Sequence, residues 1–316
     1  MLNAINLTKQ YRQHIVLDHI DFSLESGHIY GLLGKNGAGK TTTMNILTGY
    51  IAPTSGRVEI DGIDLLEHPK EAKRKIGYLP EKPPLYPEMT VLEFLHYIAG
   101  LKRIPKADRK KQIDEVLFLT KTETVSGRLI GNLSKGFQQR VGLAYAVLGF
   151  PDVIILDEPT VGIDPGELTE IREVIRSLAG DHTVVFSSHI LSEVQALCDR
   201  VLILNNAKIA AQGSLQELAL AAGGRKHFSI SAVGAKEDVQ KVLSLCPFLT
   251  AYDITLEENG ITKASVTMPE DTQTGAALFR AFSDADLPLL KIQPEELTLE
   301  KLFLKFAEEN KQEEPV

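Results

Sequence analysis

The sequence predicts an α/β protein with a parallel-sheet core, an inserted helical subdomain and a smaller C-terminal α+β domain. Three observations support this fold class. Short apolar runs such as 153–156 are typical of strands buried on both faces of a parallel sheet. Between about residues 86 and 150, apolar positions follow a helical spacing instead. After residue 227, the expected elements follow the order βαββαβ, which is typical of a ferredoxin-like domain.

The composition limits the classes of function. The chain has 316 residues, 43% of them hydrophobic, and a formal net charge of −8, which argues against a nucleic-acid binder. Its two cysteines, Cys198 and Cys246, have no metal-type spacing and indicate a reducing compartment. We find no leader pattern and no apolar stretch near the roughly 20 residues that span a bilayer. We therefore expect a cytosolic protein, or one that another chain holds at a membrane.

Residues 34–41 read GKNGAGKT, between an apolar run expected as a strand and a segment expected as a helix. This is the phosphate-loop pattern, in which backbone N–H groups at a helix N-terminus converge on an anion. Lys40 would reach the β- and γ-phosphates, the Thr41 hydroxyl would bind Mg²⁺, and Thr42 would add a phosphate contact. By itself, the segment could also be a tight glycine turn. The candidate nucleotide-binding residues are Gly34, Asn36, Gly37, Ala38, Gly39, Lys40, Thr41 and Thr42.

Acidic residues follow a second expected strand in the segment PDVIILDEPT. Asp157 and Glu158 stand at the carboxyl end of this strand, where open α/β folds bind their ligands. Asp157 is expected to organise Mg²⁺, and Glu158 to accept a proton from the attacking water. A third strand, HTVVFSSH, ends in His189, which could bond the γ-phosphate. Without the phosphate loop, a solvated acidic pair and a structural histidine would be the simpler interpretations.

The segment LSKGFQQRVGLAYAVL, residues 133–148, completes an ordered set of motifs. With the phosphate loop, the ILDEPT strand and the terminal histidine, it resembles the ATP-binding subunit of ABC transporters over residues 2–215. The resemblance implies a P-loop NTPase of the ABC ATPase type, with ATP and Mg²⁺ as cofactors. It also implies that Ser134 and Gly136 complete the ATP site of a second subunit in a head-to-tail dimer.

Further positions match the family individually. Tyr11 matches the aromatic residue that stacks on adenine, and Asp164 matches the residue that links the two sites across the dimer. Glu81 stands where the family usually has glutamine, and the resemblance implies a metal and coupling role for it. The signature reads Ser-Lys-Gly-Phe where Ser-Gly-Gly-Gln is commoner. The spellings YLPE and LSKGFQQR resemble the subclass that serves ABC-2-type exporters.

The expected domain organisation follows from these patterns. It comprises an ABC ATPase domain at 1–218 with its helical subdomain at about 86–150, a linker at 219–227, an α+β domain at 228–308 and an acidic tail at 309–316. The 94 residues that separate Lys40 from Ser134 leave no room for a coiled-coil arm of the kind found in chromosome-maintenance ATPases.

The resemblance implies an ATP-hydrolysing motor subunit that drives a separate integral-membrane permease. Its partners would be the permease and a second ATP-binding subunit, most simply another copy of this chain, and it would lie on the cytoplasmic face of the cell membrane. The alternative is a soluble ABC-type ATPase that acts on ribosomes or DNA; such relatives usually carry two cassettes or a long insertion. A small-molecule kinase fits less well, because no segment resembles an acceptor-substrate site.

Overall fold

The computed structural model describes residues 1–221, 226–258, 260–268, 272–295 and 298–309, in two compact units. The first unit comprises residues 1–215 with the segment from 303 onward, and the second comprises 216–302. Part of the expected linker (222–225) and most of the expected tail (310–316) lie outside the described residues. Within the described part of the chain, no helix is long and apolar enough to cross a membrane.

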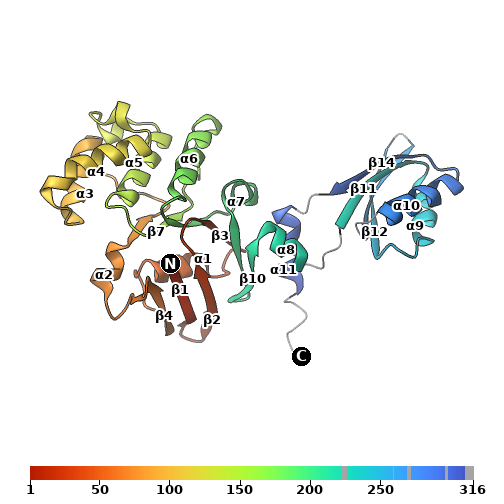
Figure 1. Ribbon diagram of the computed structural model, residues 1–316, viewed down its shortest axis with the longest axis horizontal. Coiled ribbons are helices and arrows are strands. Elements are labelled where there is room, and N and C mark those ends of the chain that lie inside the picture. The colour runs from red at the N-terminus through yellow and green to blue at the C-terminus, as the bar shows by residue number, and fades with distance from the viewer. Residues whose placement is uncertain (222–225, 259, 269–271, 296–297, 310–316) are drawn as a thin grey trace. The chain divides into compact units, whose positions relative to one another are not determined.

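A six-stranded sheet forms the centre of the first unit (Figure 1). Its strand order is β10-β9-β3-β8-β7-β6, and every pair except β10–β9 is parallel. The predicted parallel-sheet core is therefore confirmed. The strands span β3 Ile29–Gly34, β6 Ile76–Leu79, β7 Val153–Asp157, β8 Thr183–Ser187, β9 Arg200–Asn205 and β10 Lys208–Ser214.

This sheet order positions the site. Strands β3, β8 and β7 are neighbours, and their apolar residues are almost wholly buried because both faces of the sheet are covered. Parallel strands end at the same edge, so the segments that follow Gly34, Asp157 and Ser187 emerge together. Helix α1, Lys40–Leu47, starts directly after the first of these segments.

A second, antiparallel sheet of the first unit has the order β2-β1-β4-β5. Its strands are β1 Leu2–Tyr11, β2 His14–Leu24, β4 Ser55–Ile60 and β5 Ile63–Asp64. Alternate residues of β1 and β2 are buried, as expected for a sheet with one covered face. They pack with residues from α1 and the central sheet into one apolar core.

The helical subdomain forms as predicted, with α3, α4 and α5 packed together (Figure 1). Thr90 caps α3 in a reciprocal pair with Glu93, and the apolar face of the helix, Val91, Phe94, Leu95 and Ile98, is buried. The helices of the unit and its borders are α1 Lys40–Leu47, α2 Pro69–Arg74, α3 Val91–Leu101, α4 Lys106–Leu119, α5 Lys135–Val147, α6 Pro165–Leu178, α7 Leu191–Leu197, α8 Leu215–Ala221 and α11 Leu299–Glu309, with 3₁₀ turns at Glu123–Val125 and Ile130–Asn132.

The second unit has the predicted βαββαβ order and an antiparallel sheet with strand order β12-β13-β11-β14. Its first and third strands are thus the central pair, as in a ferredoxin-like fold. Its core contains Ile230, Val266, Leu278 and Phe282. The elements are β11 Lys226–Val233, α9 Lys236–Ser244, β12 Ala251–Glu258, β13 Ile261–Met268, α10 Thr272–Asp284 and β14 Leu289–Glu295.

Candidate active site

The loop between β3 and α1 curls around its own lysine. The Lys40 ammonium donates hydrogen bonds to the carbonyl oxygens of Gly34 at 2.6 Å and Lys35 at 3.3 Å. The Thr43 hydroxyl donates a hydrogen bond to the Gly39 carbonyl at 2.9 Å inside the core. Thr43, the last of three consecutive threonines, thus stabilises the start of the helix. Thr41 and Thr42 precede it in the first turn. The chain therefore holds a cation at the loop that leads into the N-terminus of α1, where backbone N–H groups favour an anion.

Two glycines of this loop have left-handed backbone angles, at which a side chain is strained. Gly37 has a φ of 84° and Gly39 a φ of 103°. A Cβ atom on Gly39 would also lie 2.7 Å from Leu17 Cδ2 and 2.9 Å from the Val16 carbonyl oxygen. Glycine is thus required at 39 for both torsion and space, while at 37 only the torsion requires it.

Lys40 and the acidic pair at the end of β7 share one electrostatic environment. Burial lowers the pKa of the Lys40 ammonium, and the charges of Glu158 and Asp157 oppose that effect. These carboxylates come from a strand that is separated from β3 only by β8. A ligand with several negative charges would further favour the charged lysine, so the site is suited to a polyphosphate.

Ser187, the last residue of β8, joins the two carboxylate-bearing residues. Its hydroxyl donates to Asp157 Oδ1 at 2.6 Å and accepts from the Glu158 N–H at 3.0 Å. The Glu158 backbone has a φ of 50°, which turns the chain sharply after the strand. The sequence does not identify Ser187 as a site residue, because it appears there only as one of two serines before a histidine. Its role depends on β8 pairing with β7, which no local pattern states.

His189 lies against the glutamate that the sequence singled out as the base. Its Nδ1 is 2.9 Å from Glu158 Oε2, and its side chain is more exposed than that of Glu158, at 58% against 17%. Because a carboxylate only accepts hydrogen bonds, Nδ1 carries the hydrogen in this pair. The structure thus brings Lys40, Asp157, Glu158 and His189 together at one sheet edge.

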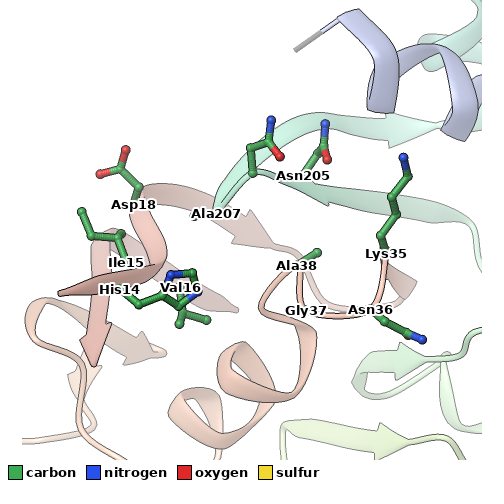
Figure 2. A pocket seen from close by; sticks show the side chains of 11 residues that line it. His14, Ile15, Val16, Asp18, Lys35, Asn36, Gly37, Ala38, Asn205 and Ala207 are labelled. Atoms are coloured by element: carbon green, nitrogen blue, oxygen red, sulfur yellow. The ribbon is translucent and has the colours of Figure 1, made fainter. Parts of the chain in front are cut away.

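A cleft of about 470 Å³ opens beside the loop, between β2 and the turn that joins β9 to β10 (Figure 2). The loop contributes the predicted residues Asn36, Gly37 and Ala38, but Tyr11 is not part of the lining. Tyr11 is 48% exposed, and the Lys9 ammonium lies 4.9 Å from its ring centroid. The other lining residues were not found from the sequence, since they share no motif: His14, Ile15, Val16, Asp18, Lys35, Asn205, Asn206 and Ala207.

The signature residues lie at the start of another helix. Ser134 is the N-cap of α5, and its Oγ accepts the Phe137 N–H at 3.3 Å. Among the described residues, no hydrogen bond joins Ser134 or Gly136 to the loop at 34–41; both instead contact Glu167 of α6. Asp164, the N-cap of α6, is exposed. One chain therefore does not assemble all the predicted residues into a single site.

Among the described residues, no hydrogen bond or ion pair joins Glu81 to Lys40, Asp157, Glu158 or His189. Glu81 lines a different cleft of about 380 Å³ on the first unit, together with Pro83, Lys135 and Gln138. The Glu81 side chain is exposed, and Val161, from the loop that follows β7, lines the same cleft. This position is consistent with a surface role, and its proposed metal role stays a prediction.

The comparisons with known proteins agree with this geometry. A family model described as ABC transporter matches residues 17–161. The chain is 34% identical over 307 residues to the bacitracin transport ATP-binding protein of Bacillus licheniformis, and 31% identical over 306 residues to the linearmycin resistance ATP-binding protein of Bacillus subtilis. The first alignment covers 96% of both chains, and the second covers 96% of this chain and 97% of the relative.

A solved structure resembles the first unit. It is a dimeric ATP-binding cassette in a post-hydrolysis state with ADP and phosphate, 26% identical with a TM-score of 0.58, and the match covers 68% of this chain and 98% of that one. The chain therefore belongs to the family of ABC transporter ATP-binding proteins and is an ATPase.

Proposed function

We propose that this chain is the motor subunit of an ABC-2-type exporter, and that it closes as a head-to-tail homodimer on ATP. The proposal of a dimer rests on the separation of the motif residues within one chain. Lys40 and Glu158 form one half of a site, while Ser134 and Gly136 contact Glu167 instead of that half. A second copy can bring its signature residues to the phosphate held by Lys40, so that each of two sites uses both chains.

The proposed chemistry follows from the contacts at the sheet edge. The phosphates bind at the loop with the Lys40 ammonium, and Glu158 accepts the proton of the water that attacks the γ-phosphate. His189 orients the Glu158 carboxylate through Nδ1, and in the imidazolium form its Nε2–H can also donate a hydrogen bond to a γ-phosphate oxygen. Loss of the γ-phosphate removes the contacts to Ser134 and Gly136 of the partner copy, and the dimer opens.

The chain's residues fit Mg²⁺ that enters with the nucleotide. Ser187 orients Asp157 by bonding Oδ1, and the exposed Thr41 hydroxyl lies at the start of α1. Both groups are hard oxygen donors, as Mg²⁺ prefers, and this ion usually takes its other ligands from phosphates and water. When bound, the ion would neutralise charge on the β- and γ-phosphates.

The cleft lined by Glu81 is the proposed docking place for a cytoplasmic segment of the permease. It contains apolar residues such as Leu85, Pro87 and Ile130 beside the charged Glu81 and Lys135. Lys135 belongs to the signature helix and Val161 to the loop after Glu158, so a segment in this cleft would contact both. Through the permease, the chain would lie at the cytoplasmic face of the cell membrane.

Two features support export over the other candidate functions. The motif spellings resemble the ABC-2-type subclass, and a relative that matches nearly the whole chain is named for linearmycin resistance. A soluble ATPase acting on ribosomes or DNA has no such support, since the matched relatives are named for transport and resistance. The net charge of −8 also disfavours nucleic acid as a partner.

The Glu158→Gln variant tests the proposal. It should bind ATP with unchanged affinity, hydrolyse it at least about 100-fold more slowly, and elute as a dimer only with ATP, because the bridging γ-phosphate stays in place. Lys40→Ala should prevent ATP binding, and Ser134→Arg should allow binding by each monomer but block the dimer. A Glu158→Gln protein that stays monomeric at saturating ATP and Mg²⁺ would contradict the shared site.

A further inference from the structure

The carboxylate of Glu167 lies on the two signature donors. The Ser134 hydroxyl donates a hydrogen bond to Glu167 Oε1 at 2.6 Å, and the Gly136 N–H donates to Oε2 at 3.0 Å. Both carboxylate oxygens are used, one for each donor. Glu167 stands in the first turn of α6, three residues after Asp164, so the contact joins two segments that are 31 to 33 residues apart.

The fit around this carboxylate is close. A Cβ atom at Gly136 would lie 2.1 Å from Glu167 Oε2, so any side chain at position 136 would displace the carboxylate. On the other side, the Glu167 backbone N–H donates to the Asp164 carbonyl at 3.0 Å, which fixes the first turn of α6. Ser134 is exposed, Glu167 is half-buried and Gly136 is buried, so an incoming ligand would reach this contact from the Ser134 side.

A carboxylate and a phosphate are alternative acceptors for the same donors. Each offers anionic oxygens to N–H and O–H groups at a helix N-terminus. Ser134 and Gly136 are the groups to which the proposed function assigns the γ-phosphate held by a second copy. Two anions cannot take the same two donors at once, and their like charges repel at this distance.

We propose that Glu167 is a built-in competitor of the partner's γ-phosphate at the signature motif. In the separate subunit the carboxylate satisfies Ser134 and Gly136, and closure of the dimer requires ATP to displace it. Glu167 thereby raises the ATP concentration at which the dimer forms, and its return to the donors favours opening after hydrolysis. This inference rests on the proposed ATP-bridged dimer.

The contact has a second explanation that the experiment must separate from the first. Glu167 could simply hold α6 against α5, in which case its loss would weaken the signature and the dimer with it. The two explanations predict opposite directions: competition predicts that a neutral residue at 167 favours the dimer, and support predicts that it disfavours the dimer. The sign of the change therefore decides between them.

The test uses the full-length chain with Glu158→Gln, in which hydrolysis is slow and the dimer persists. The ATP concentration at half-dimerisation is measured by sedimentation velocity, with and without Glu167→Gln. Glutamine keeps the side-chain length but lacks the charge, and its amide N–H₂ cannot accept from the Gly136 N–H or the Ser134 hydroxyl. We expect the half-dimerisation concentration to fall about tenfold, equivalent to about 1.4 kcal/mol.

Glu173→Gln is the matched control. Glu173 lies on the same helix and forms an exposed ion pair with Lys121 at 2.6 Å, away from the signature. The control removes the same charge from α6 and should leave the half-dimerisation concentration within about twofold, since exposed ion pairs contribute little. A tenfold fall in the control as well would show that net charge, and not the signature contact, sets the threshold, and would overturn the proposal.

Binding of ATP to the separate subunit supplies the second readout. In Ser134→Arg, where the dimer is blocked, Glu167→Gln should not change the affinity for a fluorescent ATP analogue, because the phosphates are then held by the loop around Lys40, which Glu167 does not contact. If Glu167→Gln is poorly folded, Glu167→Ala repeats the test, because the exposed Ser134 can bond water in its place. An unchanged or higher half-dimerisation concentration in the folded variant overturns the competitor role. If the Glu158→Gln parent never dimerises, the proposed function itself fails, and this inference fails with it.

Discussion

At the scale of single residues, the site depends on two kinds of residue that cannot be replaced: glycines with left-handed backbone torsions, and a lysine whose positive charge is needed. In the loop before α1, Gly37 and Gly39 both have positive φ. Only at position 39 would a Cβ atom also collide with neighbouring atoms. Burial lowers the pKa of the Lys40 ammonium, and the nearby carboxylates of Glu158 and Asp157 oppose that effect. These features could be predicted from the sequence, since glycine spacing and the strand-end acids are local patterns.

The two glycines give a matched pair of variants. Alanine at either position is strained by about 1–2 kcal/mol because of its left-handed torsion. Gly39→Ala should in addition displace Val16, which lines the cleft, and we expect its ATP affinity to fall at least about tenfold below that of Gly37→Ala. Isothermal titration with ATP and thermal unfolding measure both effects. Equal ATP affinities would mean that the contact with Val16 has no bearing on the nucleotide.

At the scale of elements, buried polar contacts join the loops that carry the catalytic residues. Glu193 of α7 is 4% exposed; it accepts hydrogen bonds from the Thr160 hydroxyl and, at 3.5 Å, from the Ser188 hydroxyl. Thr160 follows Glu158 by two residues, and Ser188 directly precedes His189. Glu193 therefore ties together the two loops that bring Glu158 and His189 to 2.9 Å.

Glu193→Ala should lower kcat about tenfold, equivalent to about 1.4 kcal/mol, and leave the ATP dissociation constant nearly unchanged. The reason is that the loops lose their common acceptor while the phosphate loop is untouched. Glu193→Gln should restore most of the rate, since its amide oxygen still accepts from Thr160. Steady-state kinetics beside equilibrium ATP binding separate the two parameters. A changed dissociation constant with a normal kcat would contradict this role.

The ends of α3 and α5 meet at a half-buried lysine. The Lys102 ammonium donates to the carbonyl oxygens of Tyr145 at 3.0 Å, Ala146 at 3.2 Å and Leu148 at 2.5 Å. Burial lowers the pKa of Lys102 to about 8 in the folded protein. The hydrogen bonds from Lys102 thus satisfy carbonyl oxygens at the C-terminus of α5, but they also hold the ammonium charge away from water.

This lysine predicts a pH dependence with a definite sign. Between about pH 8 and the ordinary lysine pKa of 10.5, the unfolded chain binds the proton that the folded chain has lost. The free energy of unfolding should therefore rise with pH across this window, by at most about 3 kcal/mol from this residue. Urea unfolding of the protein and of Lys102→Met over this range isolates the contribution. A difference between the two that is independent of pH would show that Lys102 keeps its ordinary pKa.

At the scale of the whole molecule, each of the two units has its own apolar core among the residues that the structure describes. The core of the first unit comprises residues of the two sheets and α1, and the other core fills the C-terminal unit. Lys40, Glu158 and His189 of the candidate site all belong to the first unit. The second unit can then change its stability without changing the chemistry at Lys40 and Glu158.

Two phenylalanines of α10 test this independence. Phe282→Ala removes a side chain with 0% exposure and should destabilise the C-terminal unit by about 3–5 kcal/mol, with the ATP affinity changed less than about twofold. Phe279→Ala makes the same change at a 57% exposed position and should alter stability by less than about 0.5 kcal/mol. Scanning calorimetry with ATP titration measures both. A large loss of ATP affinity in Phe282→Ala would show that the cores are coupled.

The sequence by itself determined the fold class, the loop around Lys40 and the acidic strand end, because each is a local pattern of backbone torsion, periodicity or charge. Only the tertiary structure decided that Ser187 joins Asp157 to Glu158, and that Glu167 occupies the signature donors. It also decided which residues of β2 and of the β9–β10 turn line the cleft. These contacts join segments far apart in the chain, and they depend on strand order and helix packing, which no short stretch of sequence specifies.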